Sequence, residues 1–397
     1  MDPPPPARGT SGGAGDRRPV SQGPPYHWVD TEAALARAAD RLARARAVAV
    51  DTEADSFYHY FHKCCLIQIS DGEDAYLIDP LALKDLDPLG KVFGSSAILK
   101  VLHAAEQDIL YLRRDHGFSL APLFDTMIAA QLLGKASIGL AGLLEAHFNV
   151  RLDKGCQRDN WSRRPLTEDQ KSYAAEDVRH LIRLAETLRA DLEARGRLDW
   201  AREEFEVVAR RAWEPRPFDP EAFWSLKGAR DLTPRQASVL RELFVMRDEL
   251  ARQGDVPPFR ILGDEALVAL ARRSPQEGTD LQGIKGVTPL VRRRIGSEVL
   301  AATRRGLERP EGDLPAPPRG RGRRKSAATQ ARIERLREWR RARATDLGLD
   351  PGVLFPQSTL EALAATGLAG LEDPEALPGL REWRRRLILP DAGQLLR

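Results

Sequence analysis

The chain has 397 residues, of which 42% are hydrophobic, so it is long enough to build two or three separate cores. Its 61 Lys and Arg residues nearly balance its 58 Asp and Glu residues, and the net charge of +3 excludes a uniformly basic, histone-like protein. The three cysteines, Cys64, Cys65 and Cys156, match neither a disulfide framework nor a zinc site, so a cytoplasmic location is expected.

The first 25 residues are rich in Pro, Gly and Ser, and their composition predicts a disordered tail. They contain no apolar stretch that could serve as the core of a signal peptide. Nowhere does the chain carry an uncharged apolar run long enough to span a bilayer.

A short apolar, partly β-branched run at Ala47–Val50 predicts a buried central strand. Asp51 follows at its carboxyl end, and Glu53 stands two residues later. Side chains two apart on an extended chain lie on one face, so both carboxylates can reach a single site.

A second apolar run, Ile98–Leu102, predicts another strand, followed by His103 and a helical pattern that carries Asp108. Open α/β sheets build their sites at such strand ends. His103 has two readings that the sequence leaves open: it contacts substrate, or it is a hydrogen-bonded histidine at a strand end.

The segment from Leu166 to Arg195 has continuous helical character, with a start signal at Thr167 and a stop signal at Gly196. Tyr173 and Asp177 are four residues apart in this helix and therefore share a face. Just before it, Trp161 and Arg164 either flank a nucleic acid or serve as packing residues.

Together, Asp51, Glu53, Asp108 and Asp177 would form a cluster of hard oxygen ligands, which suits Mg²⁺ or Mn²⁺. A single Asp at a strand end is more often a turn or capping residue. Four carboxylates and Tyr173, each in a suitable element, favour a metal-dependent phosphodiester-cleaving site instead.

The C-terminal half contains an internal repeat. Residues 240–243 (LREL) recur as 336–339 (LREW), and residues 267–271 (LVALA) recur as 360–364 (LEALA). One module of several helices therefore occurs twice. Between the copies, residues 308–329 are rich in Pro and Gly and predict a basic linker.

A basic stretch runs from Arg319 to Arg343 and holds eleven Lys and Arg residues against two glutamates, Glu334 and Glu338. It suggests a phosphate-binding arm with salt-sensitive affinity. The alternative, a solvated linker and helix face, stays open.

These residues carry a resemblance to ribonuclease D, a family in the DEDD superfamily of 3′-to-5′ exonucleases with a ribonuclease-H-like fold. The similarity covers residues 28–199 and includes DTEAD at 51–55, CLIQIS at 65–70, LFDTMIAAQLL at 123–133, the stretch 161–166 and YAAEDV at 173–178. The DEDD carboxylates fall on the four acidic residues above. Tyr173 stands four residues before Asp177, and Ser172 stands where the histidine subclass has its histidine, so the resemblance implies the tyrosine subclass.

The two repeated modules resemble the HRDC domain, a small helical nucleic-acid-binding domain. The first copy is expected at 216–307, and the second, looser copy at 330–397 with a short last helix. The expected fold is therefore an α/β ribonuclease-H-like exonuclease domain with a central mixed sheet at residues 26–213, followed by two all-α domains.

The resemblance implies a 3′-to-5′ exoribonuclease that trims 3′ ends of structured RNA, such as tRNA precursors, and releases nucleoside 5′-monophosphates. It implies two divalent ions per site, Mg²⁺ or Mn²⁺, held by Asp51, Glu53, Asp108 and Asp177, with Tyr173 positioning the attacking water. No membrane or obligate protein partner is expected. The alternatives are a DNA 3′-to-5′ exonuclease of the same superfamily and a noncatalytic RNA-binding scaffold.

Overall fold

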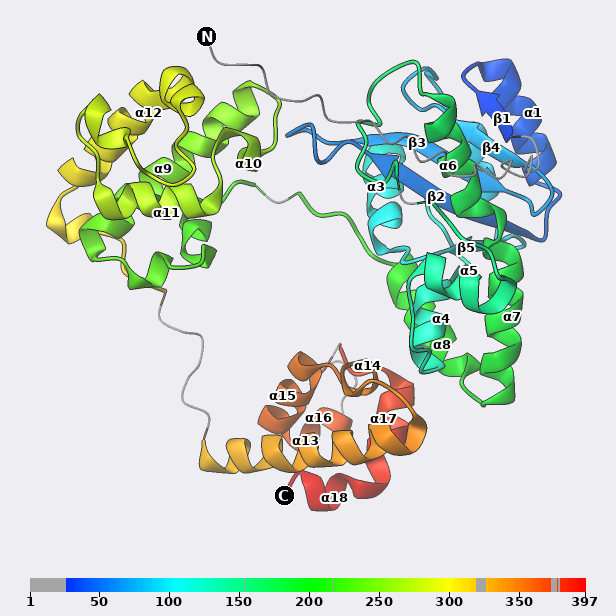
Figure 1. Ribbon diagram of the computed structural model, residues 1–397. Helices are drawn as coiled ribbons and strands as arrows, with labels where there is room; N and C mark the ends of the chain where they lie inside the picture. Colours follow the sequence, from blue (N-terminus) through cyan, green and yellow to red (C-terminus); the bar gives the residue numbers. More distant parts are fainter. Residues whose placement is uncertain (1–25, 154, 216, 319–325, 373–376, 378) are drawn as a thin grey trace, which may run out of the picture.

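The computed structural model describes residues 26–153, 155–215, 217–318, 326–372, 377 and 379–397. The predicted tail at 1–25 and residues 319–325 of the predicted linker lie outside this description. Figure 1 shows one domain built around a sheet and two helical domains after it in the chain. Within the described part of the chain, no helix is both long and apolar enough to cross a membrane.

The first domain is organised on a central mixed sheet, as predicted, and the structure gives this sheet six strands. Its strand order is β1-β4-β3-β2-β5-β6; β3 runs antiparallel to β2 and β4, and the other neighbours are parallel. The strands are β1 (Tyr26–Val29), β2 (Ala47–Ala54), β3 (Cys64–Ser70), β4 (Ala75–Ile78), β5 (Leu99–Leu102) and β6 (Leu123–Asp125).

Strand β2 is longer than the sequence predicted. The apolar run ends at Val50, but the ladder with β3 continues through Asp51, opposite Gln68, and Glu53, opposite Leu66. Pairing with β3 keeps this polar end extended. Both carboxylates therefore lie inside the strand rather than beyond it.

Eight helices accompany the sheet: α1 (Glu32–Leu42), α2 (Asp87–Gly94), α3 (Glu106–His116), α4 (Thr126–Leu132), α5 (Leu140–Phe148), α6 (Glu168–Arg179), α7 (Leu181–Ala194) and α8 (Leu198–Ala209). Helix α6 contacts β2, β3 and β4, α7 contacts β2 and β5, and α8 contacts β6.

The single helix predicted over 166–195 is two helices. Thr167 caps α6 through a capping box with Gln170, but the helix ends at His180, whose φ of −104° and ψ of −1° depart from the ideal helical values. Both helices contact β2, but α6 also packs on β3 and β4, whereas α7 packs on β5.

In both helical domains a long helix is followed by a four-residue helix and then by a ten-residue helix. The first contains η1 (Pro220–Ser225), η2 (Ala229–Asp231), α9 (Pro234–Gln253), α10 (Pro258–Ile261), α11 (Asp264–Arg273), η3 (Gly278–Leu281) and α12 (Pro289–Glu308). The second contains α13 (Ala327–Leu347), α14 (Pro351–Leu354), α15 (Gln357–Thr366), α16 (Ala369–Glu372), α17 (Glu382–Ile388), η6 (Leu389–Asp391) and α18 (Ala392–Leu395). Its last helix, which the sequence predicted to be short, is α18, with four residues.

The connection between the helical domains is shorter than predicted. Helix α12 reaches Glu308, the turn η4 covers Glu311–Asp313, and α13 already begins at Ala327. Within α13, Arg332, Arg335 and Arg340 donate to main-chain carbonyls of their own domain. For these arginines the contacts favour a structural role over a free phosphate-binding arm.

The second helical domain shares a hydrophobic core with the sheet domain, whereas the first has a core of its own. Trp383 stacks on Trp200 of α8 with ring centroids 4.6 Å apart. The Glu204 carboxylate accepts hydrogen bonds from Trp383 Nε1 at 3.0 Å and from Arg384 at 2.5 Å. This junction mixes stacked aromatic rings with a largely buried ion pair.

The first helical domain contacts the sheet domain through polar groups on the β2–β3 loop. His59 Nδ1 lies 2.8 Å from Asp255, and the Tyr60 hydroxyl donates to Asp248 at 2.9 Å. The guanidinium of Arg260 lies 4.4 Å from the centre of the Tyr58 ring. The β2–β3 loop, which follows the carboxylate-bearing strand β2, therefore also contacts the first helical domain.

Candidate active site

Strand β2 and helix α6 bring three of the predicted carboxylates together. Asp51 and Glu53 project from the same face of β2, and α6, which packs across that strand, contributes Asp177. One ligand oxygen from each of the three lies within 4.8 Å of the other two. This spacing allows all three to bind one cation.

The fourth carboxylate, Asp108, approaches from the first turn of α3 and is only 9% exposed. It lies outside the group of three, and its carboxylate accepts a hydrogen bond from Thr52 Oγ1 at 2.5 Å. Thr52 stands between Asp51 and Glu53 on β2, so Asp108 is held beside the same strand segment.

Burial raises the pKa values of all four carboxyl groups, and repulsion within the cluster adds to this for Asp51 and Glu53. Burial first, and then the charges of Asp108, Asp177 and Glu53, raise the pKa of Asp51 well above its ordinary value. Burial, with repulsion from Asp177 and Asp108, raises the pKa of Glu53 to about 9. Burial also raises the pKa values of Asp108 and Asp177 to about 7. Such a cluster favours either protons or a bound cation.

Tyr173 lies one turn before Asp177 on α6 and is hydrogen-bonded to it. Burial and the charges of Asp177 and Glu53 raise the pKa of its hydroxyl. The ring packs against Trp161, with the centroids 6.1 Å apart. The hydroxyl is therefore protonated at neutral pH and is held at the edge of the carboxylate cluster.

A cavity of about 440 Å³ opens beside these groups. Asp51, Glu53, Tyr173 and Asp177 form one wall. The facing wall, which the sequence analysis did not single out, comes from the start of α5 and from the segment before α6; it consists of Ser137, Gly139, Leu140, Ala141, Gly142, Leu152, Asp153 and Gln157. In the sequence, the run of small residues just before an apolar helix could have indicated this wall. Neither Lys nor Arg is among the described residues that line the cavity.

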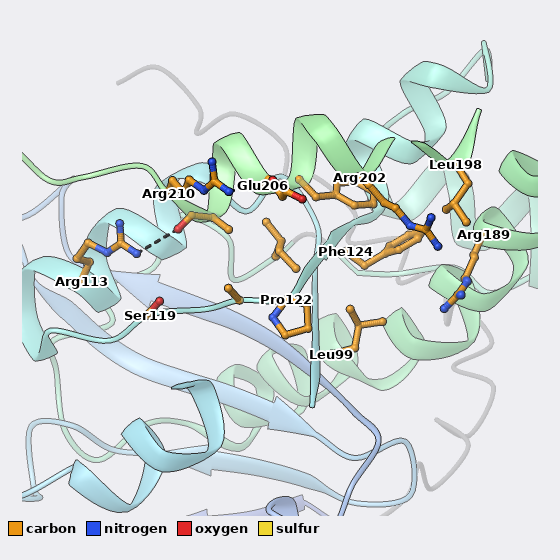
Figure 2. Close-up of a pocket in the computed structure, with 14 residues that line it drawn as sticks. Leu99, Arg113, Ser119, Pro122, Phe124, Arg189, Leu198, Arg202, Glu206 and Arg210 are labelled. Carbon is orange, nitrogen blue, oxygen red and sulfur yellow. Dashed lines mark hydrogen bonds and ion pairs between the residues drawn. The ribbon is translucent and has the colours of Figure 1, made fainter. Parts of the chain in front are cut away.

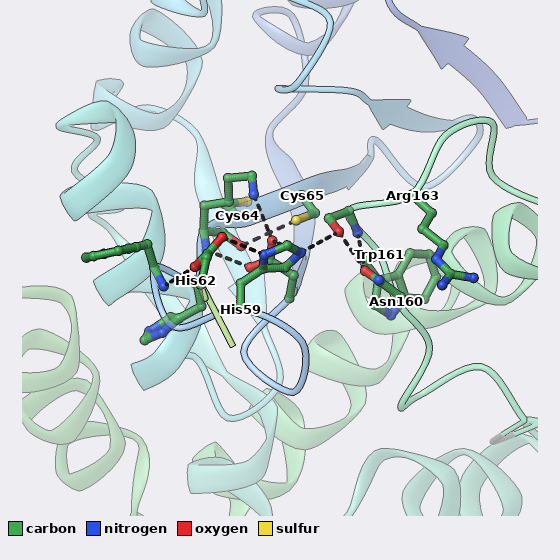
Figure 3. A network of polar contacts seen from close by, with 12 residues as sticks. His59, His62, Cys64, Cys65, Asn160, Trp161 and Arg163 are labelled. Carbon is green, nitrogen blue, oxygen red and sulfur yellow. Dashed lines mark hydrogen bonds and ion pairs between the residues drawn. The ribbon is translucent and has the colours of Figure 1, made fainter. Parts of the chain in front are cut away.

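The loop after Glu53 is held by a polar network, shown in Figure 3. Asp55 is fully buried and pairs with Lys63 at 2.8 Å. His59 Nε2 lies 3.1 Å from Ser162 Oγ, which in turn donates to Asn160 Oδ1 at 2.6 Å. The network links strand β2 to the segment that precedes α6.

The sequence left the roles of Trp161, Arg164 and His103 undecided, and in the structure all three contact other residues of the protein. Trp161 is 1% exposed, which leaves no free ring face for stacking on a base. Arg164 donates to both oxygens of Asp79, at 2.6 and 2.7 Å. This pairing favours the role of a packing residue over that of a residue that flanks a nucleic acid. His103 Nδ1 lies 2.9 Å from Thr126 Oγ1, and burial lowers the pKa of its ring.

Two family models match the chain. The model described as 3′-5′ exonuclease matches residues 26–193, and the model described as HRDC domain matches residues 236–303 and again 329–391. The first match contains all four carboxylates and Tyr173. The two HRDC matches fall on the two helical domains.

Similar proteins extend over nearly the whole chain. Ribonuclease D of Nitrobacter hamburgensis is 34% identical over 91% of this chain and 92% of its own length, and that of Pseudomonas paraeruginosa is 33% identical over 91% and 95%. Among solved structures, Escherichia coli RNase D, described as an exoribonuclease involved in structured RNA processing, is 28% identical with a TM-score of 0.70 and covers 94% of this chain and 98% of its own. A protein from Bifidobacterium adolescentis is 26% identical with a TM-score of 0.80, over 95% and 98%.

Proposed function

This chain belongs to the ribonuclease D family and is a 3′-to-5′ exoribonuclease, and from that premise we propose that it trims the 3′ ends of structured RNA, such as tRNA precursors. The products would be nucleoside 5′-monophosphates. The observation that carries the proposal is the group of Asp51, Glu53 and Asp177 beside Tyr173 in a chain similar to ribonuclease D along nearly its whole length.

The carboxylate cluster fits the divalent cations that the family uses. Its donors are all hard oxygen atoms, which Mg²⁺ and Mn²⁺ prefer. Burial raises the pKa values of Glu53 and Asp177, and no described Lys or Arg of the cavity wall compensates their negative charge. Two bound cations would supply an activated water and neutralise charge on the leaving oxygen.

We assign ligand roles by the resemblance to the DEDD exonucleases. Asp51 would bridge both cations, Glu53 and Asp177 would hold the cation on the side of the attacking water, and Asp108 would help to hold the other. The separation of Asp108 from the group of three supports its assignment to a different cation.

Tyr173 would position the attacking water rather than deprotonate it. Its pKa is raised above an ordinary value that is already far above neutral, so a phenolate is not available as a base. Its hydrogen bond to Asp177 and its packing against Trp161 fix the direction in which the hydroxyl points. The protonated hydroxyl can therefore orient a water molecule by hydrogen bonding.

The helical domains would capture the body of the RNA while its 3′ end enters the cavity. Their family is a nucleic-acid-binding one, and both flank the sheet domain (Figure 1).

The three free cysteines, of which Cys64 and Cys65 are buried, support the cytoplasmic location predicted from the sequence.

The decisive experiment compares a 3′-extended tRNA precursor with a DNA strand of matched sequence, each with and without a metal chelator. We expect stepwise shortening of the RNA from its 3′ end, release of nucleoside 5′-monophosphates and complete inhibition by the chelator. Preferred digestion of the DNA strand would favour the DNA-exonuclease alternative. RNA binding without turnover at any metal concentration would favour the noncatalytic scaffold.

A further inference from the structure

A second large cavity, of about 550 Å³, lies between β6 and α8, away from the carboxylate cluster (Figure 2). Leu99 in its wall is the first residue of β5 and pairs with Ala47 at the start of β2. Asp51 lies four residues farther along β2, about 13 Å at the rise of an extended strand. The two cavities therefore lie toward opposite ends of the parallel strands.

Four arginines line this second cavity: Arg113, Arg189, Arg202 and Arg210. One carboxylate, Glu206, is among the described residues of its wall. Figure 2 shows Arg113 and Arg210 toward one end and Arg189 and Arg202 toward the other. The excess of guanidinium groups makes the cavity complementary to an anion.

Three of these guanidinium groups can change partners at little cost. Arg189, Arg202 and Arg210 each pair with a carboxylate three or four residues away, at 2.9 to 3.1 Å, and both partners of each pair are more than half exposed. Exposed pairs of this kind contribute little to stability. Arg113 is held differently, because it donates to the main-chain carbonyls of Ala209 and Arg211.

The floor between the two ends is apolar, and its accessible surface comes from Leu99 and Pro122, because Phe124 and Phe205 are each only 4% exposed. Phe124 and Phe205 pack on each other with ring centroids 4.8 Å apart. A simple inorganic anion would leave this floor uncovered, whereas a ligand with a flat, weakly polar ring would cover it. The volume lies in the usual range of small-molecule sites.

We propose that this cavity binds a nucleotide, with the base against the apolar floor and phosphate at the arginine-lined ends. The inference rests on the proposed function only in taking RNA as the source of such ligands. Two sources share this chemistry: a unit of the RNA strand, with phosphate on both sides of its base, and a free mononucleotide of the kind that the reaction releases. Cationic groups at both ends favour the strand.

The test is calorimetric titration of the full chain in the presence of chelator, so that binding is measured without turnover. The probes are 5′-AMP and the 5′-phosphorylated dinucleotide pApA, with adenosine and inorganic phosphate as controls that each lack one half of the recognised chemistry. We expect saturable binding of one nucleotide per chain and weaker binding of both controls. Tighter binding of pApA than of 5′-AMP identifies the strand as the ligand, and equal binding identifies the mononucleotide.

The double variant Arg189→Ala/Arg202→Ala should weaken nucleotide binding about tenfold or more, because charge-assisted hydrogen bonds are lost. The matched control is Arg37→Ala/Arg44→Ala, which removes the same charge from exposed positions outside the cavity and should leave binding unchanged. Absence of saturable binding, or an equal loss in both double variants, would overturn the proposal. Either result leaves the chelator-sensitive digestion assay unaffected, so the proposed function stands or falls separately.

Discussion

Binding of a divalent cation to the carboxylate cluster should release protons, because the cation and the protons compete for the same oxygens. Without a cation, burial and repulsion within the cluster raise the pKa of Glu53 to about 9, and burial raises the pKa values of Asp108 and Asp177 to about 7. The perturbation is the addition of Mg²⁺ to the metal-free chain at pH 7.

The expected magnitude follows from these pKa values. At pH 7 Glu53 holds about one proton, and Asp108 and Asp177 hold about half a proton each, so binding that ionises these three groups releases about two protons. Asp51, whose pKa is also raised, adds to this number. The affinity for Mg²⁺ should then rise about a hundredfold or more per pH unit near neutrality. Above about pH 9 the rise should become less steep, because Glu53 is then ionised before the cation binds.

The stability of the metal-free chain should change in the opposite direction. These carboxyl groups have higher pKa values in the folded chain than in the unfolded chain, so the folded state holds more protons. Their contribution to stability is present at acidic pH and is lost as the pH rises through about 7 and about 9. Added Mg²⁺ should therefore raise the Tm more at pH 8 than at pH 6.

Calorimetric titration of Mg²⁺ in two buffers of different ionisation enthalpy measures the number of protons directly. Asp51→Asn should weaken binding, whereas Asp40→Asn, which changes an exposed carboxylate of α1, should not. Identical heats in both buffers together with a pH-independent affinity would refute the reasoning, since the carboxyl groups would then be ionised before the cation arrives.

Three further outcomes are expected. Asp51→Asn should abolish measurable cleavage while the RNA is still retained in a filter-binding assay; near-normal turnover would contradict the proposed bridging role. Tyr173→Phe should keep Mg²⁺ binding and lower kcat by about 10²- to 10⁴-fold, and lost Mg²⁺ binding would instead indicate a structural role. Glu204→Gln should destabilise the junction between α8 and the second helical domain by about 3 kcal/mol, since Arg384 is left buried without its counter-charge; thermal unfolding measures this against the exposed control Glu206→Gln, and equal Tm values in the two variants would contradict it.

Local spacing along the chain predicted which candidate site residues share a face before any tertiary contact was known. Residues that are two positions apart on a strand, or four positions apart on a helix, lie on one face of that element regardless of the tertiary structure. Asp51 with Glu53, and Tyr173 with Asp177, were therefore paired correctly from the sequence. The repeated helical domains were recognisable for a similar reason, because a repeat is a property of the sequence itself.

The boundaries of the helices and strands, and the roles of single side chains, could be predicted less well from the sequence. The polar end of β2 continues as a strand because β3 pairs with it, and the helix predicted over 166–195 is interrupted at His180 where the covered strands change. Trp161 reads equally well as a stacking residue or as a packing residue in sequence. Its burial against Tyr173, which only the fold decides, makes it a packing residue.

The tertiary structure alone decided which distant segments meet. It separated Asp108, bound to Thr52, from the group of three carboxylates, and it placed Trp383 on Trp200 so that the second helical domain shares the core of the sheet domain. It also assembled the arginine-lined cavity from α3, β5, β6, α7 and α8. In sequence these residues look like ordinary amphipathic positions, because the free energy that selects one packing partner over another comes from long-range contacts that local periodicity does not encode.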